Sequence, residues 1–364
     1  MMKVYSRDLL LLLVILTLGW VSLAFFFHVV LDFNFMGSDV QSYWQDSMEW
    51  QTPFNSVHVP GYPLIIALSR GLGPGIQSPI ILMMGINFMA FVVSAVAVFF
   101  IIISSGVPKG FATLGAALFG LWPFVGLVYA VYPIADTPAI AFLLTGILAL
   151  LHLRRFLAAL LLGISLVVHK AMWPIVVLLV VAYLVSSRQR SWRDYLALLI
   201  MILPVVVLWV GGMHYYGSPM WIISTSVGVG ADFRATRPVF EGIIGTFQQG
   251  GFRGGAKGGI ITGFFIASIA LAFLNARVRP RFFLYGIAVC VGSFSLFAFM
   301  THVDIWAAVR FSRLLVVPLV WLVSHLYRGE QPIWFGRRMV AVLMLVCFSS
   351  QFFFSWYMAK VFIG

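Results

Sequence analysis

The chain has 364 residues, of which 62% are hydrophobic and only 9% are charged, and its mean hydropathy is +1.03. A water-soluble domain of this length needs far more polar surface, so the composition excludes that class and predicts an all-α, polytopic membrane protein. The net charge of +12 does not indicate a nucleic-acid partner, because the basic residues stand in short clusters between apolar runs. Cys290 and Cys347 both lie inside apolar runs, so neither a disulfide framework nor a cysteine metal cluster is expected.

Apolar runs long enough to cross a membrane recur along the whole chain. A spanning helix needs about 20 apolar residues, and by this measure we predict about eleven spans in one integral-membrane domain, residues 1–364. The predicted spans are 9–31, 80–104, 111–131, 137–153, 156–170, 172–187, 195–216, 259–275, 282–300, 314–327 and 339–358. No small-residue cleavage site follows the first run, so we interpret it as a retained helix rather than a removed signal peptide.

Positive charges are distributed unevenly between the loops that join these predicted spans. If the N-terminus is cytoplasmic, fourteen of the 23 Lys and Arg residues lie in the cytoplasm, as the positive-inside rule favours. An odd number of spans then places the C-terminus outside. The same threading brings eight of the 11 acidic residues to the extracytoplasmic side: Asp32, Asp39, Asp46, Glu49, Asp136, Asp232, Glu241 and Asp304. We therefore predict a carboxylate-bearing site at that surface.

Three segments on the predicted outer side are longer than a turn, at residues 32–79, 217–258 and 301–313. Long outer loops and short basic inner loops suggest that function is built on the outer face. The second segment is rich in glycine but lacks the Lys-Ser/Thr ending and the preceding strand of a phosphate-binding loop. Its basic residues fit either a flexible loop at the lipid head groups or a lid over a substrate.

Asp39 follows the first predicted span, in the stretch Gly37–Trp44. A carboxylate held at a membrane surface beside aromatic side chains can bind a proton more readily, which suits a general base acting on a hydroxyl group. Ser38 and Asp39 are also good N-cap residues. The sequence therefore leaves two roles open for Asp39, a catalytic base and a helix cap.

Four further motifs follow Asp39 in chain order. They are His58-Val59-Pro60-Gly61-Tyr62-Pro63-Leu64, Asp136-Thr137-Pro138, His169-Lys170 ahead of Pro174, and Arg310-Phe311-Ser312-Arg313. His58 can steer a phosphate or a hydroxyl group, or can bond a carbonyl of its own turn. His169 and Lys170 stand where two short spans meet, and can contact a phosphate or act as the charges of a turn.

Arg310 and Arg313 are three residues apart, so they occupy one face of a helix. A guanidinium fork binds a phosphate with two hydrogen bonds, and a helix N-terminus also favours an anion. The alternative is that both side chains reach out to lipid head groups, as arginine does at the ends of spans. Asp304, a short distance upstream, favours the interpretation as a site.

In their order and sidedness, these residues resemble the GT-C superfamily of membrane glycosyltransferases, which use polyprenyl-phosphate-linked sugars. The resemblance covers residues 1–190 well and the more variable helical half, 191–364, loosely. It implies a GT-C-like fold whose extracytoplasmic first loop carries short helices. The chain departs from the family pattern in having Ser38-Asp39 instead of two adjacent acids, and no large C-terminal soluble domain.

By this resemblance, Asp39 matches the catalytic base and Asp136 the second outer acid near the site. The substrate-binding residues would be His58, Tyr62, His169, Lys170, Asp304, Arg310 and Arg313. The partners would be the membrane, a polyprenyl-phosphate sugar donor and a glycan, lipid or protein acceptor. A divalent metal is not required by the sequence, and the question of a cofactor stays open.

The expected function is an inverting transfer of a sugar to an acceptor hydroxyl on the extracytoplasmic side, with Asp39 as the base. The alternative is a transporter or flippase of a lipid-linked glycan, because many spans and broken helices also suit alternating access. An enzyme should gather Asp39, Asp136 and Arg310 around one outer cavity. A transporter should line a path through the middle of the membrane with polar groups.

Overall fold

The computed structural model describes residues 2–32, 38–48, 60–72, 78–107, 109–122, 126–169, 172–186, 191–217, 313–316, 348–349 and 352, and all regular structure within them is helical. The elements are α1 (Met2–Phe25), the π-helical turn η1 (Phe26–Val30), α2 (Ser38–Met48), α3 (Gly61–Leu72), α4 (Pro79–Ser104), α5 (Lys109–Gly120), α6 (Val128–Val131), α7 (Asp136–Leu151), α8 (Arg155–Val168), α9 (Trp173–Ser186), α10 (Trp192–Tyr216) and the 3-10 turn η3 (Arg313–Leu315).

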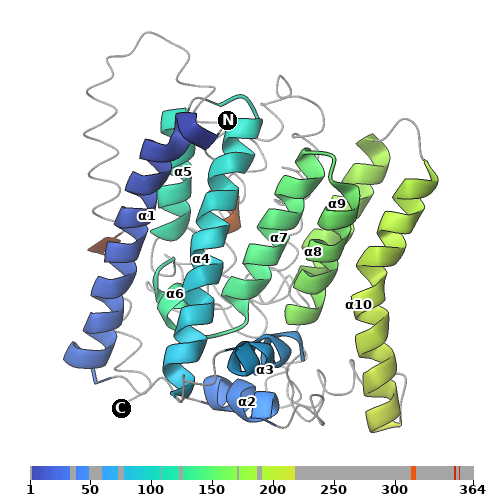
Figure 1. Cartoon of the computed structure of the whole chain (residues 1–364), viewed down its shortest axis with the longest axis horizontal. Coiled ribbons are helices and arrows are strands. Elements are labelled where there is room, and N and C mark those ends of the chain that lie inside the picture. The colour runs from blue at the N-terminus through green and yellow to red at the C-terminus, as the bar shows by residue number, and fades with distance from the viewer. Residues whose placement is uncertain are drawn as a thin grey trace, which may run out of the picture.

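The long helices stand side by side, and successive ones run in opposite directions (Figure 1). Helix α7 packs between α4 and α8, and α8 packs in turn against α10. The two short helices α2 and α3 pack on each other and lie across one end of the bundle (Figure 1), which we call the α2–α3 end. Helices α1, α5, α8 and α10 begin at the opposite end, and α4, α7 and α9 begin at the α2–α3 end.

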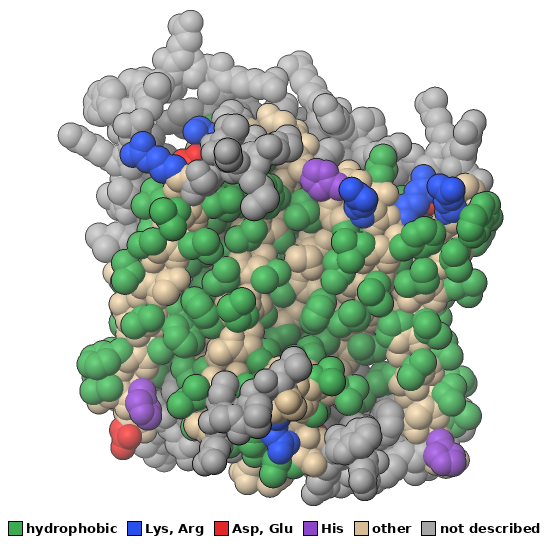
Figure 2. Space-filling view, viewed as in Figure 1, with side chains coloured by type: hydrophobic (Ala, Val, Ile, Leu, Met, Phe, Trp, Pro, Cys, Tyr) green, Lys and Arg blue, Asp and Glu red, His purple; other side chains and the backbone are tan. Residues whose placement is uncertain are grey.

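The end of the bundle opposite α2 and α3 carries most of the positive charge of the described helices. The end opposite α2 and α3, here called the basic end, carries Arg7, Lys109, Arg154, Arg155 and Arg193. Figure 2 shows most of the visible Lys and Arg side chains along this end, beside a broad band of hydrophobic side chains. The helices therefore present an apolar belt between two polar ends, which is the arrangement that a bilayer requires.

Three described helices are long and apolar enough to cross a membrane: Arg7–Val30, Pro79–Ser104 and Trp192–His214. Three shorter apolar helices, Asp136–Leu151, Arg155–Val168 and Trp173–Val185, stand beside them. Large apolar side chains are exposed on the outer helices, among them Leu18 (62%) and Leu199 (65%). Lipid accepts such a surface, whereas a monomeric soluble protein rarely exposes so much.

Helices coincide with six of the seven segments predicted as spans in the first 217 residues, and three of these helices are long enough to cross a membrane, while the seventh segment needs a correction. The span predicted over 111–131 is not a single helix, because α5 ends at Gly120 and α6 begins only at Val128. A proline at 123 disfavours helix at the residue before it, and the Gly126 amide closes a turn on the Trp122 carbonyl at 2.9 Å. The spans predicted beyond residue 217 lie almost wholly outside the described residues, so the count of about eleven stays a prediction.

Candidate functional site

A contact between a buried carboxylate and a partly buried imidazole joins the start of α7 to the end of α8. Asp136 is the first residue of α7, and His169 directly follows the last residue of α8. The Asp136 Oδ1 atom lies 3.1 Å from His169 Nε2, and the Asp136 side chain is only 2% exposed. Because α7 and α8 are antiparallel neighbours, their two ends meet near the α2–α3 end. The N-terminus of α7 also favours a carboxylate at this position.

Arg313 lies beside this pair, although it is far away in the sequence. Its side chain is fully enclosed, with 1% of the residue exposed, and the Asp136 carboxylate interacts with it electrostatically. The Arg313 Nη2 atom donates to Thr137 Oγ1 at 3.2 Å, and Thr137 donates in turn to the Tyr129 carbonyl at 2.6 Å. The guanidinium carbon lies 5.5 Å from the centre of the Phe119 ring. These contacts hold a buried cation in one place.

Two nitrogen atoms of Arg313 are not used by these contacts. Neither Nε nor Nη1 has a hydrogen-bond partner among the described residues, and both are buried. Guanidinium nitrogens are obligatory donors, and leaving them unsatisfied in an apolar interior costs free energy. An anionic group that reached this point would supply the missing acceptors.

Tyr62 forms a second polar network next to the first. Its hydroxyl donates to Asn87 Oδ1 at 2.9 Å, and Asn87 Nδ2 donates to the carbonyls of Tyr132 and Ile134, both at 3.1 Å. Asn87 therefore fastens the segment that leads into Asp136 to α4. Burial, and next the negative charge of Asp136, raises the pKa of Tyr62. The phenol therefore stays neutral and remains a hydrogen-bond donor.

Gly61 explains how α3 reaches this site. A Cβ atom at Gly61 would lie 2.2 Å from the Val167 carbonyl oxygen, so only glycine allows the start of α3 to approach the end of α8. The ring of Tyr62 then meets the ring of Tyr43 of α2 edge to face, with centroids 4.9 Å apart. Asp39 stands one turn before Tyr43 in α2.

Of the nine predicted site residues, the structure brings four together: Tyr62, Asp136, His169 and Arg313. They come from α3, α7, the end of α8 and η3. The backbone of Asp39 lies near the start of α2, but its side chain is outside the described part of the chain. The others that lie outside the described residues are His58, Lys170, Asp304 and Arg310.

The sequence-based selection missed Asn87 and gave no separate role to Thr137. Asn87 had a detectable signal, because it is a single amide side chain within the 26-residue apolar helix α4, and polar side chains at membrane depth often mark functional sites. Thr137 is the middle residue of the Asp136-Thr137-Pro138 motif. Its role as the acceptor for Arg313 depends on a contact across 176 residues, which no local pattern indicates.

Comparisons with known proteins provide no family for this chain: no family model matches it, and no curated protein matches it. Within the described residues there is also no group of three or more His, Cys, Asp or Glu side chains that could hold a metal ion. The chemistry of the site must therefore be inferred from Asp136, His169, Arg313 and the groups that hold them.

Proposed function

We propose that this protein is a membrane glycosyltransferase that transfers a sugar from a polyprenyl-phosphate donor to an acceptor hydroxyl at the α2–α3 end. One observation carries the proposal: a buried guanidinium with two nitrogen atoms that lack partners among the described residues stands beside a buried carboxylate that also contacts an imidazole. A guanidinium fork suits a phosphate, and carboxylates suit the proton transfers that activate a hydroxyl group.

The reaction requires a base and a group that stabilises the departing phosphate. The acceptor oxygen attacks the anomeric carbon, its proton passes to a carboxylate, and the bond from that carbon to the phosphate oxygen breaks. The bonding electrons leave with the lipid phosphate, where negative charge grows. Arg313 Nε and Nη1 would meet that charge, and donors already fixed in a site that excludes water are the most effective ones.

Asp39 is the proposed base, and Asp136 supports the site. Asp136 is almost fully buried, and its charge is shared between His169 and Arg313, so it serves best to compensate the guanidinium and to orient the imidazole. Asp39 belongs to α2, which packs on the Tyr62 helix α3. That position, together with the motif resemblance, favours Asp39 as the group that takes the acceptor proton.

The distribution of charge favours an extracytoplasmic location for the site. The basic end holds five of the described arginine and lysine residues, namely Arg7, Lys109, Arg154, Arg155 and Arg193. The positive-inside rule places such an end in the cytoplasm. The α2–α3 end, with Asp136 and His169 near it, then faces outward, where lipid-linked sugars meet acceptors that have already been exported.

The alternative function is movement of a lipid-linked glycan across the membrane. The buried polar side chains of Asn87, Asp136 and Arg313 favour it, because transporters place such groups inside the helical bundle. The two functions differ in one measurable respect. A transferase breaks the bond between sugar and phosphate, and a flippase leaves that bond intact.

The test is to incubate the purified full-length protein with a panel of polyprenyl-phosphate sugars and a mixed set of acceptors, and to follow donor and product by mass spectrometry. We expect one donor to lose its sugar, and Arg313→Lys to slow this transfer because it keeps the charge but removes the fork. Arg70→Lys is the matched control, since Arg70 contacts Trp44 and the Ser47 carbonyl outside the site. Donors that change leaflet in vesicles but stay intact would overturn the proposal in favour of the flippase.

A further inference from the structure

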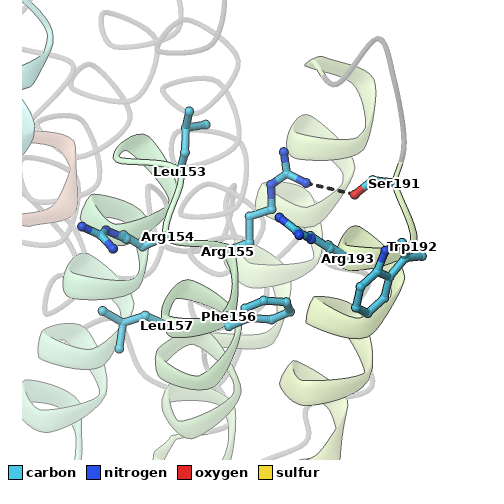
Figure 3. A pocket seen from close by; sticks show the side chains of 8 residues that line it. All are labelled: Leu153, Arg154, Arg155, Phe156, Leu157, Ser191, Trp192 and Arg193. Carbon is cyan, nitrogen blue, oxygen red and sulfur yellow. Dashed lines mark hydrogen bonds between the residues drawn. The ribbon is translucent and has the colours of Figure 1, made fainter.

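A hollow of about 850 Å³ lies at the basic end, remote from the candidate site. It is lined by residues 153–157, where the chain turns from α7 into α8, and by residues 191–193, where α10 begins. Figure 3 shows the side chains that line it: those of Arg155 and Arg193 lie between α8 and α10 with Trp192 to one side, and that of Arg154 extends from the turn in the other direction. Arginines from the turn before α8, from the start of α8 and from the start of α10 therefore line one hollow.

Arg155 is anchored to the wall of the hollow by two contacts. Its Nη1 atom lies 2.9 Å from Asp194 Oδ1 and 3.3 Å from Ser191 Oγ. Asp194 is buried, accepts the Ser191 amide at 2.8 Å as part of a capping box at the start of α10, and accepts the Tyr183 hydroxyl. The carboxylate of Asp194, next to the hollow, is therefore already occupied.

Arg154 and Arg193 are held much less tightly. The Arg193 guanidinium lies 5.9 Å from the centre of the Trp192 ring, and within the described ranges neither arginine has an ion pair with a carboxylate. Among the described residues, three arginines set against Asp194 leave a net charge of +2 at the hollow. Helices α8 and α10 also both begin here, and their N-termini add to the attraction for an anion.

The surroundings of the hollow match a lipid better than a soluble anion. Helix α10 is apolar and long enough to cross a membrane, and Trp192 at its start is 68% exposed. Below the arginines the outer faces of α8 and α10 expose Leu157 (51%), Tyr195 (55%) and Leu199 (65%). Exposed Trp and Tyr at the end of a span mark the membrane–water boundary, and arginine there reaches the head groups.

We propose that this hollow binds the phosphate-bearing head group of an anionic phospholipid in the leaflet at the basic end, with the acyl chains along the exposed apolar faces of α8 and α10. Arg154 and Arg193 contact the phosphate, and Arg155 shapes the wall. A free phosphate would gain nothing from the apolar faces. This inference requires that the protein is embedded in a membrane, but it is independent of the proposed glycosyl transfer.

The experiment is native mass spectrometry of the full-length protein, freed of endogenous lipid, with either dioleoyl phosphatidylglycerol or dioleoyl phosphatidylcholine. We expect phosphatidylglycerol to be retained in preference to phosphatidylcholine. Each basic side chain close to an anionic lipid strengthens binding roughly fivefold. The double variant Arg154→Gln/Arg193→Gln should therefore weaken retention of phosphatidylglycerol by about 25-fold.

The double variant Arg7→Gln/Lys109→Gln is the matched control, because it removes the same charge from the same end but outside the hollow. It should retain the lipid as the unmodified protein does. If the first double variant does not fold, Arg154→Gln alone should show about a fivefold loss, since the Arg154 side chain is exposed. Equal losses in both double variants, equal retention of the two lipids, or displacement of the lipid by millimolar inorganic phosphate would each overturn the proposal.

Discussion

The charges at the candidate site and the outer arginines of the hollow differ in their surroundings. Near the α2–α3 end, Asp136 and Arg313 are each about 1% exposed and lie close enough to interact. At the basic end, Arg154 is exposed and Arg193 stacks on an exposed Trp192 ring. Water screens the second group but not the first. Buried charges that depend on one another tolerate substitution poorly, whereas the exposed arginines can be replaced with little effect on folding.

The largest expected effect of this difference is on stability. Asp136→Asn should lower the free energy of unfolding by roughly 3–5 kcal/mol, because it leaves the Arg313 cation buried without its compensating charge. Denaturant unfolding in detergent measures this loss. Asp8→Asn is the control, because Asp8 pairs with the exposed Lys109, and such pairs contribute only about 0–1 kcal/mol. If both variants lost the same free energy of unfolding, the buried pair would stabilise the protein no more than the exposed pair does.

The next effect is on catalysis at the α2–α3 end. Asp39→Asn should slow sugar transfer by about 10²–10⁴-fold, because an amide cannot accept the acceptor proton. Asp39 is the second residue of α2, so loss of its charge near the helix N-terminus should cost only about 0.3–1 kcal/mol and change thermal stability little. Steady-state rates and a melting curve of the same preparation test both statements. If the Asp39→Asn protein were fully active and the Asp136→Asn protein were folded but inactive, the base would be Asp136 and not Asp39.

Close packing near the site provides a third comparison within one helix. Gly61→Ala should destabilise the protein by about 1–3 kcal/mol, because the new Cβ atom would press on the Val167 carbonyl and push α3 away from α8. Gly71→Ala is the matched control in α3, since a Cβ atom there meets nothing within 4 Å. Thermal unfolding of the two variants measures the difference, and equal melting temperatures would show that α3 has room to move.

An effect of similar size is expected from the Tyr62 hydrogen bond. Tyr62→Phe should cost about 1–3 kcal/mol, because it leaves the buried Asn87 Oδ1 without its donor. Tyr195→Phe is the control, because Tyr195 is 55% exposed and water can replace its contacts. Denaturant unfolding distinguishes the two. If Tyr62→Phe left the free energy of unfolding unchanged, the Asn87 network would not depend on α3.

Local patterns predicted most helices in the first 217 residues. Residues 80–104, for example, were predicted as a span and form α4 to within one residue at the N-terminal end. The segment 111–131 was predicted wrongly, because hydropathy summed over a window does not detect the turn between Gly120 and Val128. Asn87 was overlooked because the selection followed motifs near the ends of predicted spans, while its amide acts through two backbone carbonyls that only the packed structure brings near.

The sequence by itself determined that the chain is helical and apolar enough for a membrane, and where most described helices begin and end. It also placed Asp136 at the start of one predicted span and His169 where two other short spans meet. These properties depend on composition and on short-range periodicity, which are visible without a fold. Only the tertiary structure decided that Arg313 meets Thr137 across 176 residues, and that Arg154 and Arg193 surround one hollow. Such contacts arise from the packing of whole helices against one another, and no local stretch of sequence encodes their geometry.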